Sequence, residues 1–241
     1  MNNTILGKVA CAAGLIIAGM AGTGVLVRNL LWNPSAPKPI PGKRHLVCIG
    51  DSITFGAGVV PQQHRYSYPS FLQNKLGDRV QVMNFGLSGR TLLSTGDVPY
   101  IREKHYPKTL QIDHASYLIM LGTNDSKPYN WNEAAYRQEL KSFLGKYIAA
   151  AGNEGVTVMQ PPKAFVLPGE TAEKFDIKDQ TIRTVCKIIE EVAQELSVQV
   201  IDLYHFTENH PEWFADGIHP NRQGNQAIGE YIAQFLILFL N

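Results

Sequence analysis

Five short apolar runs recur along the chain, and turn-forming or polar residues bound each of them. The runs cover residues 45–49, 80–85, 117–121, 156–159 and 198–201. They are largely continuous in hydrophobicity, which is typical of strands buried on both faces of a parallel sheet. We therefore predict five strands, the first three of which are followed by Gly50, Gly86 and Gly122.

Segments with a helical spacing of apolar residues separate these runs. They span residues 67–76, 131–151, 181–196 and 225–240. Strands that alternate with helices favour right-handed crossover connections. The pattern predicts a three-layer α/β/α sandwich with a five-stranded parallel sheet. An apolar content of 44% and a charged content of 18% also fit a globular domain with a core.

The N-terminal part of the chain carries a different pattern. Residues 9–27 form an uncharged and mostly apolar run, long enough as a helix to nearly span the ~30 Å hydrocarbon layer of a bilayer. We predict a membrane helix here, with the following domain outside the cytoplasm. A cleaved signal peptide is the alternative, but its apolar region is usually shorter, and residues 21–23 (AGT) make a poor cleavage site.

This pattern divides the chain into three parts. Residues 1–30 form the anchor or signal segment, residues 31–43 a proline-rich linker, and residues 44–241 the folded domain. The prolines bias the linker to extended geometry, either as a stalk or as a strap on the domain surface. The final apolar run, residues 235–240, is too short to span a membrane, and we expect it to pack in the core.

Charge and cysteine content exclude several classes of function. The net charge of +1 and the lack of a basic stripe argue against nucleic-acid binding. The three cysteines have no zinc-like spacing, and no HExxH pattern occurs, so we expect no catalytic metal. The oligomeric state is not predicted by any of these features.

Four polar, glycine-rich turns carry the candidate chemistry. They read GDSIT at residues 50–54, NFGLSGR at 84–90, GTND at 122–125 and DGIHPN at 216–221. In an open parallel sheet, ligands bind beyond the carboxyl ends of the strands. The first three turns follow predicted strands, so we expect all four to converge on one edge.

Residue types within these turns point to nucleophilic catalysis. A serine hydroxyl such as that of Ser52 becomes a good nucleophile when a neighbouring imidazole accepts its proton. Asp216 precedes His219 by three residues, so one turn can bring the carboxylate to the ring. Asp202 and His205 have the same spacing and compete for this role. We prefer His219, because Pro220 and Asn221 lead from it into the last predicted helix.

Taken together and in this order, the four turns resemble the four sequence blocks of SGNH/GDSL hydrolases. The resemblance covers residues 45–240 and implies a flavodoxin-like SGNH hydrolase fold and an esterase that needs no cofactor. It implies that Ser52 is the nucleophile, His219 the base and Asp216 the residue that orients the base. It also implies an oxyanion hole made by the backbone amides of Ser52 and Gly89 and the side chain of Asn124. Asp51 and Asp125 are expected to brace turns through backbone hydrogen bonds.

The substrate class is less closely defined. The runs GTNDSKPYNW and NFGLSGRTLL resemble bacterial carbohydrate or sialate O-acetylesterases, so we expect removal of O-acetyl groups from a glycan outside the cell. The alternatives are a lysophospholipase or thioesterase, an acyltransferase, and a non-catalytic glycan-binding protein. Arg90 is expected either to contact an acidic substrate or to pair with a carboxylate. Four aromatic residues near the predicted rim are expected either to stack on sugars or to take part in ordinary packing: Tyr66, Tyr100, Tyr129 and Trp131.

Overall fold

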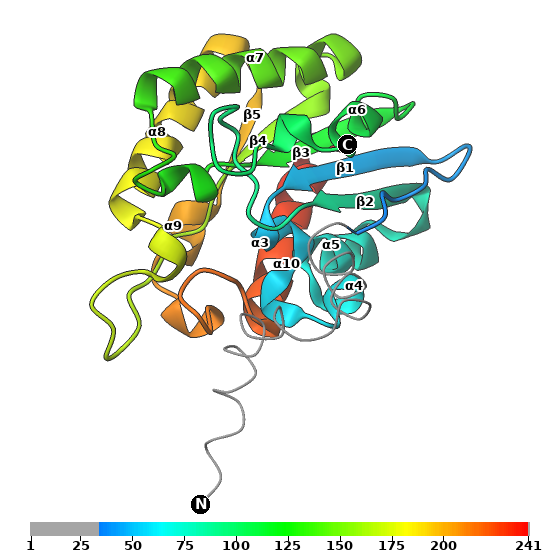
Figure 1. Cartoon of the computed structure of the whole chain (residues 1–241). Helices are drawn as coiled ribbons and strands as arrows, with labels where there is room; N and C mark the ends of the chain where they lie inside the picture. Colours follow the sequence, from blue (N-terminus) through cyan, green and yellow to red (C-terminus); the bar gives the residue numbers. More distant parts are fainter. Residues whose placement is uncertain (1–33, 241) are drawn as a thin grey trace, which may run out of the picture. The chain divides into compact units, whose positions relative to one another are not determined.

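A computed structural model describes residues 34–240 of the chain, and its centre is a sheet of five parallel strands (Figure 1). The spatial order of the strands is β2-β1-β3-β4-β5. Their bounds are β1 Arg44–Gly50, β2 Val80–Gly86, β3 Ala115–Met120, β4 Val156–Gln160 and β5 Gln199–Asp202. The predicted five-stranded parallel sheet is confirmed.

Helices connect the strands as the sequence pattern predicts. The four long helices are α5 Tyr68–Leu76, α7 Glu133–Ala151, α8 Asp179–Leu196 and α10 Arg222–Leu240. Shorter helices are α3 Ser52–Phe55, α4 Gln63–Tyr66, α6 Tyr106–Thr109 and α9 Leu203–Thr207. Helix α7 begins two residues after the predicted start, because the Asn132 side chain caps it by accepting the Ala135 N–H at 3.0 Å.

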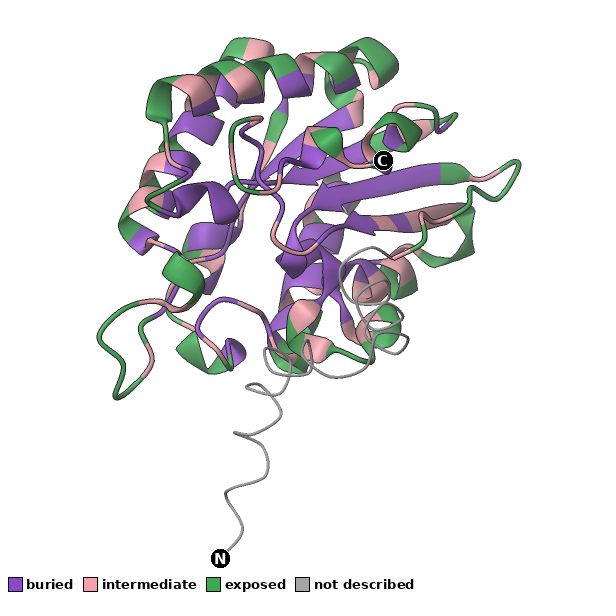
Figure 2. Ribbon diagram, viewed as in Figure 1, coloured by how far each residue is buried: buried purple, intermediate pink, exposed green. Residues whose placement is uncertain are grey.

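Side chains on the two faces of the sheet belong to two separate cores. Val47 and Ile49 of β1 point to the face that α7 and α8 cover, whereas Leu46 and Cys48 point to the face that α5 and α10 cover. This alternation follows from the two-residue period of a strand. Figure 2 shows the strands buried between helices whose outer sides are exposed. The predicted three-layer arrangement is therefore confirmed.

The register of the central strands brings their carboxyl ends to one level. Gly50 at the end of β1 pairs with Gly86 of β2 and with Met120 of β3. A Cβ atom at Gly86 would lie only 2.2 Å from the Phe55 backbone nitrogen, so only glycine allows α3 to pack this closely against β2. The three turns that follow these strands start side by side.

Part of the predicted linker lies on the domain surface as a strap. The Gln81 side chain accepts the Ile40 N–H at 2.7 Å and donates to the Lys38 carbonyl at 3.0 Å. Phe235 and Leu236, at the start of the last apolar run, pack in the core between α10 and the sheet, as expected.

The predicted membrane segment, residues 9–27, lies outside the described residues, as do residues 1–30 as a whole. Within residues 34–240, no helix is both long enough and apolar enough to cross a bilayer. The anchor, the domain boundaries and the location outside the cytoplasm stay predictions.

The packing at Gly86 gives a test of the fold. We expect Gly86→Ala to lower the free energy of unfolding by about 1–3 kcal/mol, because the new methyl group meets backbone atoms that cannot move independently. Gly145→Ala in α7 is the matched control, since its Cβ would meet nothing within 4 Å. Urea unfolding of both variants checks this, and equal stability of the two would contradict it.

Candidate active site

Ser52 lies at the point where β1 passes into α3. The Asp51 side chain caps α3 by accepting the Ile53 N–H at 2.9 Å, so the capping role falls to Asp51 rather than to Ser52. The Ser52 hydroxyl is therefore left available for another partner. Ser52 as a whole is only 7% exposed.

That partner is the imidazole of His219, which comes from the loop before α10. The distance from His219 Nε2 to Ser52 Oγ is 2.8 Å, across 167 positions of sequence. On the other side of the ring, Nδ1 lies 2.7 Å from Asp216 Oδ2. The structure thus brings together Ser52, His219 and Asp216, the three residues that the sequence predicts to be catalytic.

Hydrogen bonding to Asp216 decides which ring nitrogen carries the proton. A carboxylate can only accept, so the proton of a neutral His219 resides on Nδ1 and leaves Nε2 as an acceptor facing the serine. Burial alone would raise the pKa of Asp216, but the hydrogen bond and charge of His219 and two backbone N–H groups outweigh it. The pKa of Asp216 is lowered as a result, so the carboxyl stays ionised at neutral pH.

The predicted oxyanion donors lie on turns that Asn124 connects. The Asn124 side-chain amide donates to Asp51 Oδ2 at 3.3 Å and to the Arg90 carbonyl at 3.2 Å. It therefore joins the residue before Ser52 to the residue after Gly89. Gly89 has a φ of 83°, which favours glycine. Among residues 34–240, the backbone N–H groups of Ser52 and Gly89 have no hydrogen-bond partner.

Two buried aspartates brace these turns, as the sequence predicts. The carboxylate of Asp125 accepts the N–H groups of Leu92 and Leu93 at 3.0 and 2.8 Å, which fixes the segment after Gly89. Burial raises the pKa of Asp125 to about 7. Burial likewise raises the pKa of Asp51 to about 6, although its hydrogen bond to Ile53 and the charge of His219 act in the opposite direction.

The competing pair, Asp202 and His205, also forms, but in a different place. His205 Nδ1 lies 2.5 Å from Asp202 Oδ2, and the ring borders a cavity of about 340 Å³ at the carboxyl ends of β4 and β5. The lining residues of this cavity do not include Ser52. They include Cys186, but burial and the nearby charges of Asp202 and Asp179 raise the pKa of its thiol, so it is a poor nucleophile.

Several residues expected near the substrate have other partners. Arg90 is 4% exposed and pairs with Glu103 at 2.9 Å, so the carboxylate alternative is confirmed and contact with an acidic substrate is not supported. Tyr100 is fully buried and donates to the Phe85 carbonyl, so of its two alternatives the structure shows ordinary packing and not stacking on a sugar. Of the four aromatic candidates, Tyr129 is the strongly exposed one, at 63%.

Phe175 is a site residue that the sequence did not indicate. Its ring lies 5.5 Å from the His219 ring, edge to face, yet it is 56% exposed. It comes from the irregular segment between β4 and α8, which has no periodic pattern and no match to the four polar turns. No sequence signal distinguished it from other loop aromatics.

The site offers no evident set of metal ligands. Within the described part of the chain, no group of three or more His, Cys, Asp or Glu side chains is arranged to hold a metal ion. Asp216 and Asp51 each use both carboxylate oxygens for hydrogen bonds within the protein.

The raised pKa of Asp125 gives a prediction for stability against pH. Its pKa is about 7 in the folded protein, against an ordinary value of 3.8. Between these values only the folded state holds the proton, so the free energy of unfolding falls as the pH rises through this window. We expect the wild type to lose about 1–4 kcal/mol more than Asp125→Asn across it. Urea unfolding from pH 4 to pH 8 measures this, and the exposed variant Asp78→Asn, which should track the wild type, is the control.

Comparisons with known proteins show the family and agree with the fold. The chain is 36% identical over 216 residues to an acetylxylan esterase from Xylanibacter ruminicola, covering 84% of this chain and 45% of that protein. It therefore spans less than half the length of that relative. It is 25% identical over 204 residues to an arylesterase from Vibrio mimicus, covering 81% of this chain and 89% of that one.

Solved structures share the fold. The carbohydrate acetylesterase Est24 from Sinorhizobium meliloti superposes with a TM-score of 0.63 at 22% identity, over 81% of this chain and 99% of that one. An aryl esterase from M. smegmatis superposes with a TM-score of 0.64 at 22% identity, over the same shares of the two chains. Residues 48–227 match the family model described as GDSL-like lipase/acylhydrolase. These residues include the whole Ser52–His219–Asp216 arrangement, and the chain belongs to the GDSL-like lipase/acylhydrolase family of carboxylic ester hydrolases.

Proposed function

We propose that this protein is a serine esterase that removes O-acetyl groups from a carbohydrate through an acyl-serine intermediate. The observation that carries the proposal is the 2.8 Å contact between His219 Nε2 and Ser52 Oγ, with Asp216 on the opposite ring nitrogen. This arrangement has the geometry that a nucleophile, a base and an orienting carboxylate require.

In the first half of the reaction, Ser52 Oγ attacks the ester carbonyl carbon while His219 Nε2 takes the hydroxyl proton. The carbonyl π bond opens and leaves a negative charge on oxygen. The carboxylate of Asp216 stabilises the imidazolium that forms. The bond from carbon to the alcohol oxygen then breaks, and His219 returns the proton to that oxygen, which releases the alcohol and leaves the acyl-serine.

In the second half, water takes the place of the alcohol. His219 removes a proton from the water as its oxygen attacks the acyl carbon, and the bond to Ser52 Oγ breaks as the serine is reprotonated. In both halves the oxyanion accepts hydrogen bonds from the backbone N–H groups of Ser52 and Gly89, which have no partner within the described residues. It also accepts from Asn124 Nδ2, which exchanges one of its long hydrogen bonds, at 3.3 Å to Asp51 and 3.2 Å to the Arg90 carbonyl, for the oxyanion.

An acetylated carbohydrate is the substrate that the similarities favour. The relative from X. ruminicola is named an acetylxylan esterase, and the solved Est24 is called a carbohydrate acetylesterase. A glycan outside the cell fits the apolar segment predicted at residues 9–27. A lipid acyl ester is the main competitor, and the acyl-chain dependence separates the two.

The catalytic assignment predicts two opposite results among three alanine variants. We expect Ser52→Ala and His219→Ala each to lower kcat by at least about a thousandfold on nitrophenyl acetate, because the first removes the nucleophile and the second removes the base that accepts its proton. His205→Ala is the matched control, since it removes the imidazole of the other Asp-x-x-His pair, and it should keep wild-type activity. An inactive His205 variant beside an active His219 variant would show that the base is misassigned.

Asn124 should act on the transition state rather than on binding. We expect Asn124→Ala to lower kcat about a hundred- to a thousandfold with little change in KM, because its amide contacts the oxygen only when that oxygen becomes charged. Steady-state kinetics on an acetyl ester, with circular dichroism to verify folding, measure this. A rise in KM alone would assign Asn124 to ground-state binding.

Acyl-chain length tests the substrate class. We expect kcat/KM on nitrophenyl esters to be highest for acetate and to fall as the acyl chain lengthens. Release of acetate from acetylated xylan, measured directly, is the companion assay. A preference for chains of about eight carbons or more, where each methylene adds apolar surface to bury, would favour a lipid acyl ester instead.

A further inference from the structure

Several exposed apolar side chains come from segments that border the catalytic turns. Among residues 34–236, the large hydrophobic residues that are strongly exposed are Ile40, Val60, Tyr129, Val166 and Phe175. All but Ile40 come from segments that contact the catalytic turns. We call these four residues, Val60, Tyr129, Val166 and Phe175, the apolar rim.

Separate contacts tie each rim segment to the site. Just before Val60, Gly58 packs so closely on Pro220 that a Cβ atom would lie 2.2 Å from the Pro220 carbonyl oxygen. Beside Val166, the Phe165 N–H donates to the Gly217 carbonyl at 2.9 Å. Next to Tyr129, the Asn130 side chain donates to the Asn124 carbonyl at 2.9 Å. The rim is therefore held against the same turns that carry the catalytic groups.

The backbone at Phe175 is strained. Phe175 and Asp176 have φ values of 61° and 59°, in the left-handed region that bulky residues rarely adopt. Contacts just beyond them hold this conformation. Ile177 is buried in one cluster with Ile218, and the Lys178 N–H donates to Ser126 Oγ at 3.1 Å.

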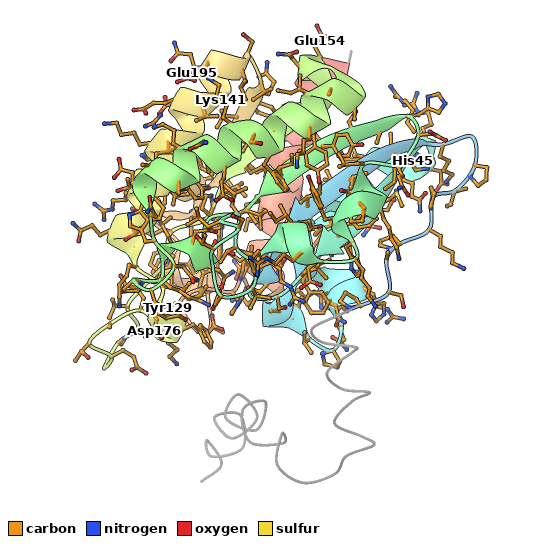
Figure 3. The ribbon with its side chains drawn as sticks, turned by 45° about the horizontal axis from the view of Figure 1, so that its top comes forward. His45, Tyr129, Lys141, Glu154, Asp176 and Glu195 are labelled. Atoms are coloured by element: carbon orange, nitrogen blue, oxygen red, sulfur yellow. The ribbon has the colours of Figure 1, made fainter. Side chains whose placement is uncertain are left out.

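The left-handed backbone conformation at Phe175 determines where its side chain points. It directs a phenyl ring against the catalytic imidazole while leaving more than half of the residue open to solvent. A turn with no other purpose would be more stable with glycine at this position. Figure 3 labels Tyr129 and Asp176 at the same corner of the molecule, and the Lys178–Ser126 hydrogen bond joins their two segments.

Reaction chemistry identifies the part of the substrate that Phe175 meets. His219 Nε2 must deliver a proton to the alcohol oxygen as that group departs, so the alcohol lies on the imidazole side of the scissile bond. The acyl oxygen lies instead toward the donors of Ser52, Gly89 and Asn124. A ring packed on the imidazole therefore faces the alcohol portion of the ester.

We propose that Phe175, supported by the rest of the apolar rim, is a specificity-determining residue that selects esters whose alcohol portion is a ring, namely a sugar pyranose. The C–H face of a pyranose is flat and apolar, and it matches an exposed aromatic face in size and polarity. This inference rests on the proposed esterase function and adds to it the side from which the carbohydrate is recognised.

Kinetics with matched leaving alcohols test the proposal. The substrates share an acetyl group and differ in the alcohol: an acetylated methyl xyloside and phenyl acetate carry rings, whereas trifluoroethyl acetate does not. We expect Phe175→Ala to lower kcat/KM about three- to tenfold on the two ring substrates and to leave trifluoroethyl acetate unchanged. Phe175→Trp should retain the ring preference, and Ile40→Ala, an exposed residue outside the rim, should behave as the wild type.

A glycine variant separates recognition from folding. Phe175→Gly relieves the left-handed strain, so its Tm should equal or exceed that of Phe175→Ala, yet it should lose the ring preference to the same extent. An unchanged ratio of ring to non-ring activity in both variants would overturn the proposal. So would a selective loss on long-chain acyl esters, which would assign the rim to the acyl group.

Binding gives a readout that does not need turnover. We expect a xylo-oligosaccharide to bind the Ser52→Ala protein more tightly than the Ser52→Ala/Phe175→Ala protein, as measured by calorimetry. Equal binding, or none to either, would overturn the role of Phe175 whether or not the protein hydrolyses esters. Conversely, a wild type that binds the sugar through Phe175 but cleaves no ester would refute only the proposed esterase function.

Discussion

The contact between His219 Nε2 and Ser52 Oγ is the interaction on which the site depends. It joins a residue at the start of the folded domain to one shortly before its last helix. A hydrogen bond weakens steeply when its distance or angle departs from the optimum, so both residues must be held to within a fraction of an ångström. The parallel sheet supplies this rigidity, because Ser52 directly follows β1, and α10, which follows the His219 loop, packs on the same sheet.

Buried polar groups hold the turns of the candidate site in place, and their burial costs stability. Asp51 and Asp125 are both fully buried, and burial raises the pKa values of both. Each carboxylate is retained because it satisfies backbone N–H groups that would otherwise be unpaired in the interior. Asn124 then links the turn at Ser52 to the turn at Gly89. The turns that carry the proposed oxyanion donors are thus fixed by a hydrogen-bonded network and not by hydrophobic packing alone.

The proposed catalytic residues and the residues that border them come from different parts of the chain. Ser52, Gly89, Asn124 and His219 lie on the four polar turns that are recognisable in the sequence. Phe175 and Val166 come instead from the irregular segment between β4 and α8. Loops of this kind tolerate change without disturbing the sheet, so they are where substrate preference can vary while the chemistry stays the same.

By itself the sequence determined the strand order along the chain, the helical connections and the four polar turns, because these depend on local periodicity and on short motifs. It also predicted that Ser52, Asp216 and His219 are catalytic. However, Asp202 and His205 have the same Asp-x-x-His spacing as Asp216 and His219. Only the tertiary structure showed which histidine contacts the serine, since it places His219 against Ser52 and His205 beside the cavity at the carboxyl ends of β4 and β5. Likewise, only long-range packing buried Tyr100 and Arg90 and exposed Phe175 beside the imidazole. Local pattern specifies which face of an element is apolar, whereas the neighbours of a loop residue depend on segments far away in the chain.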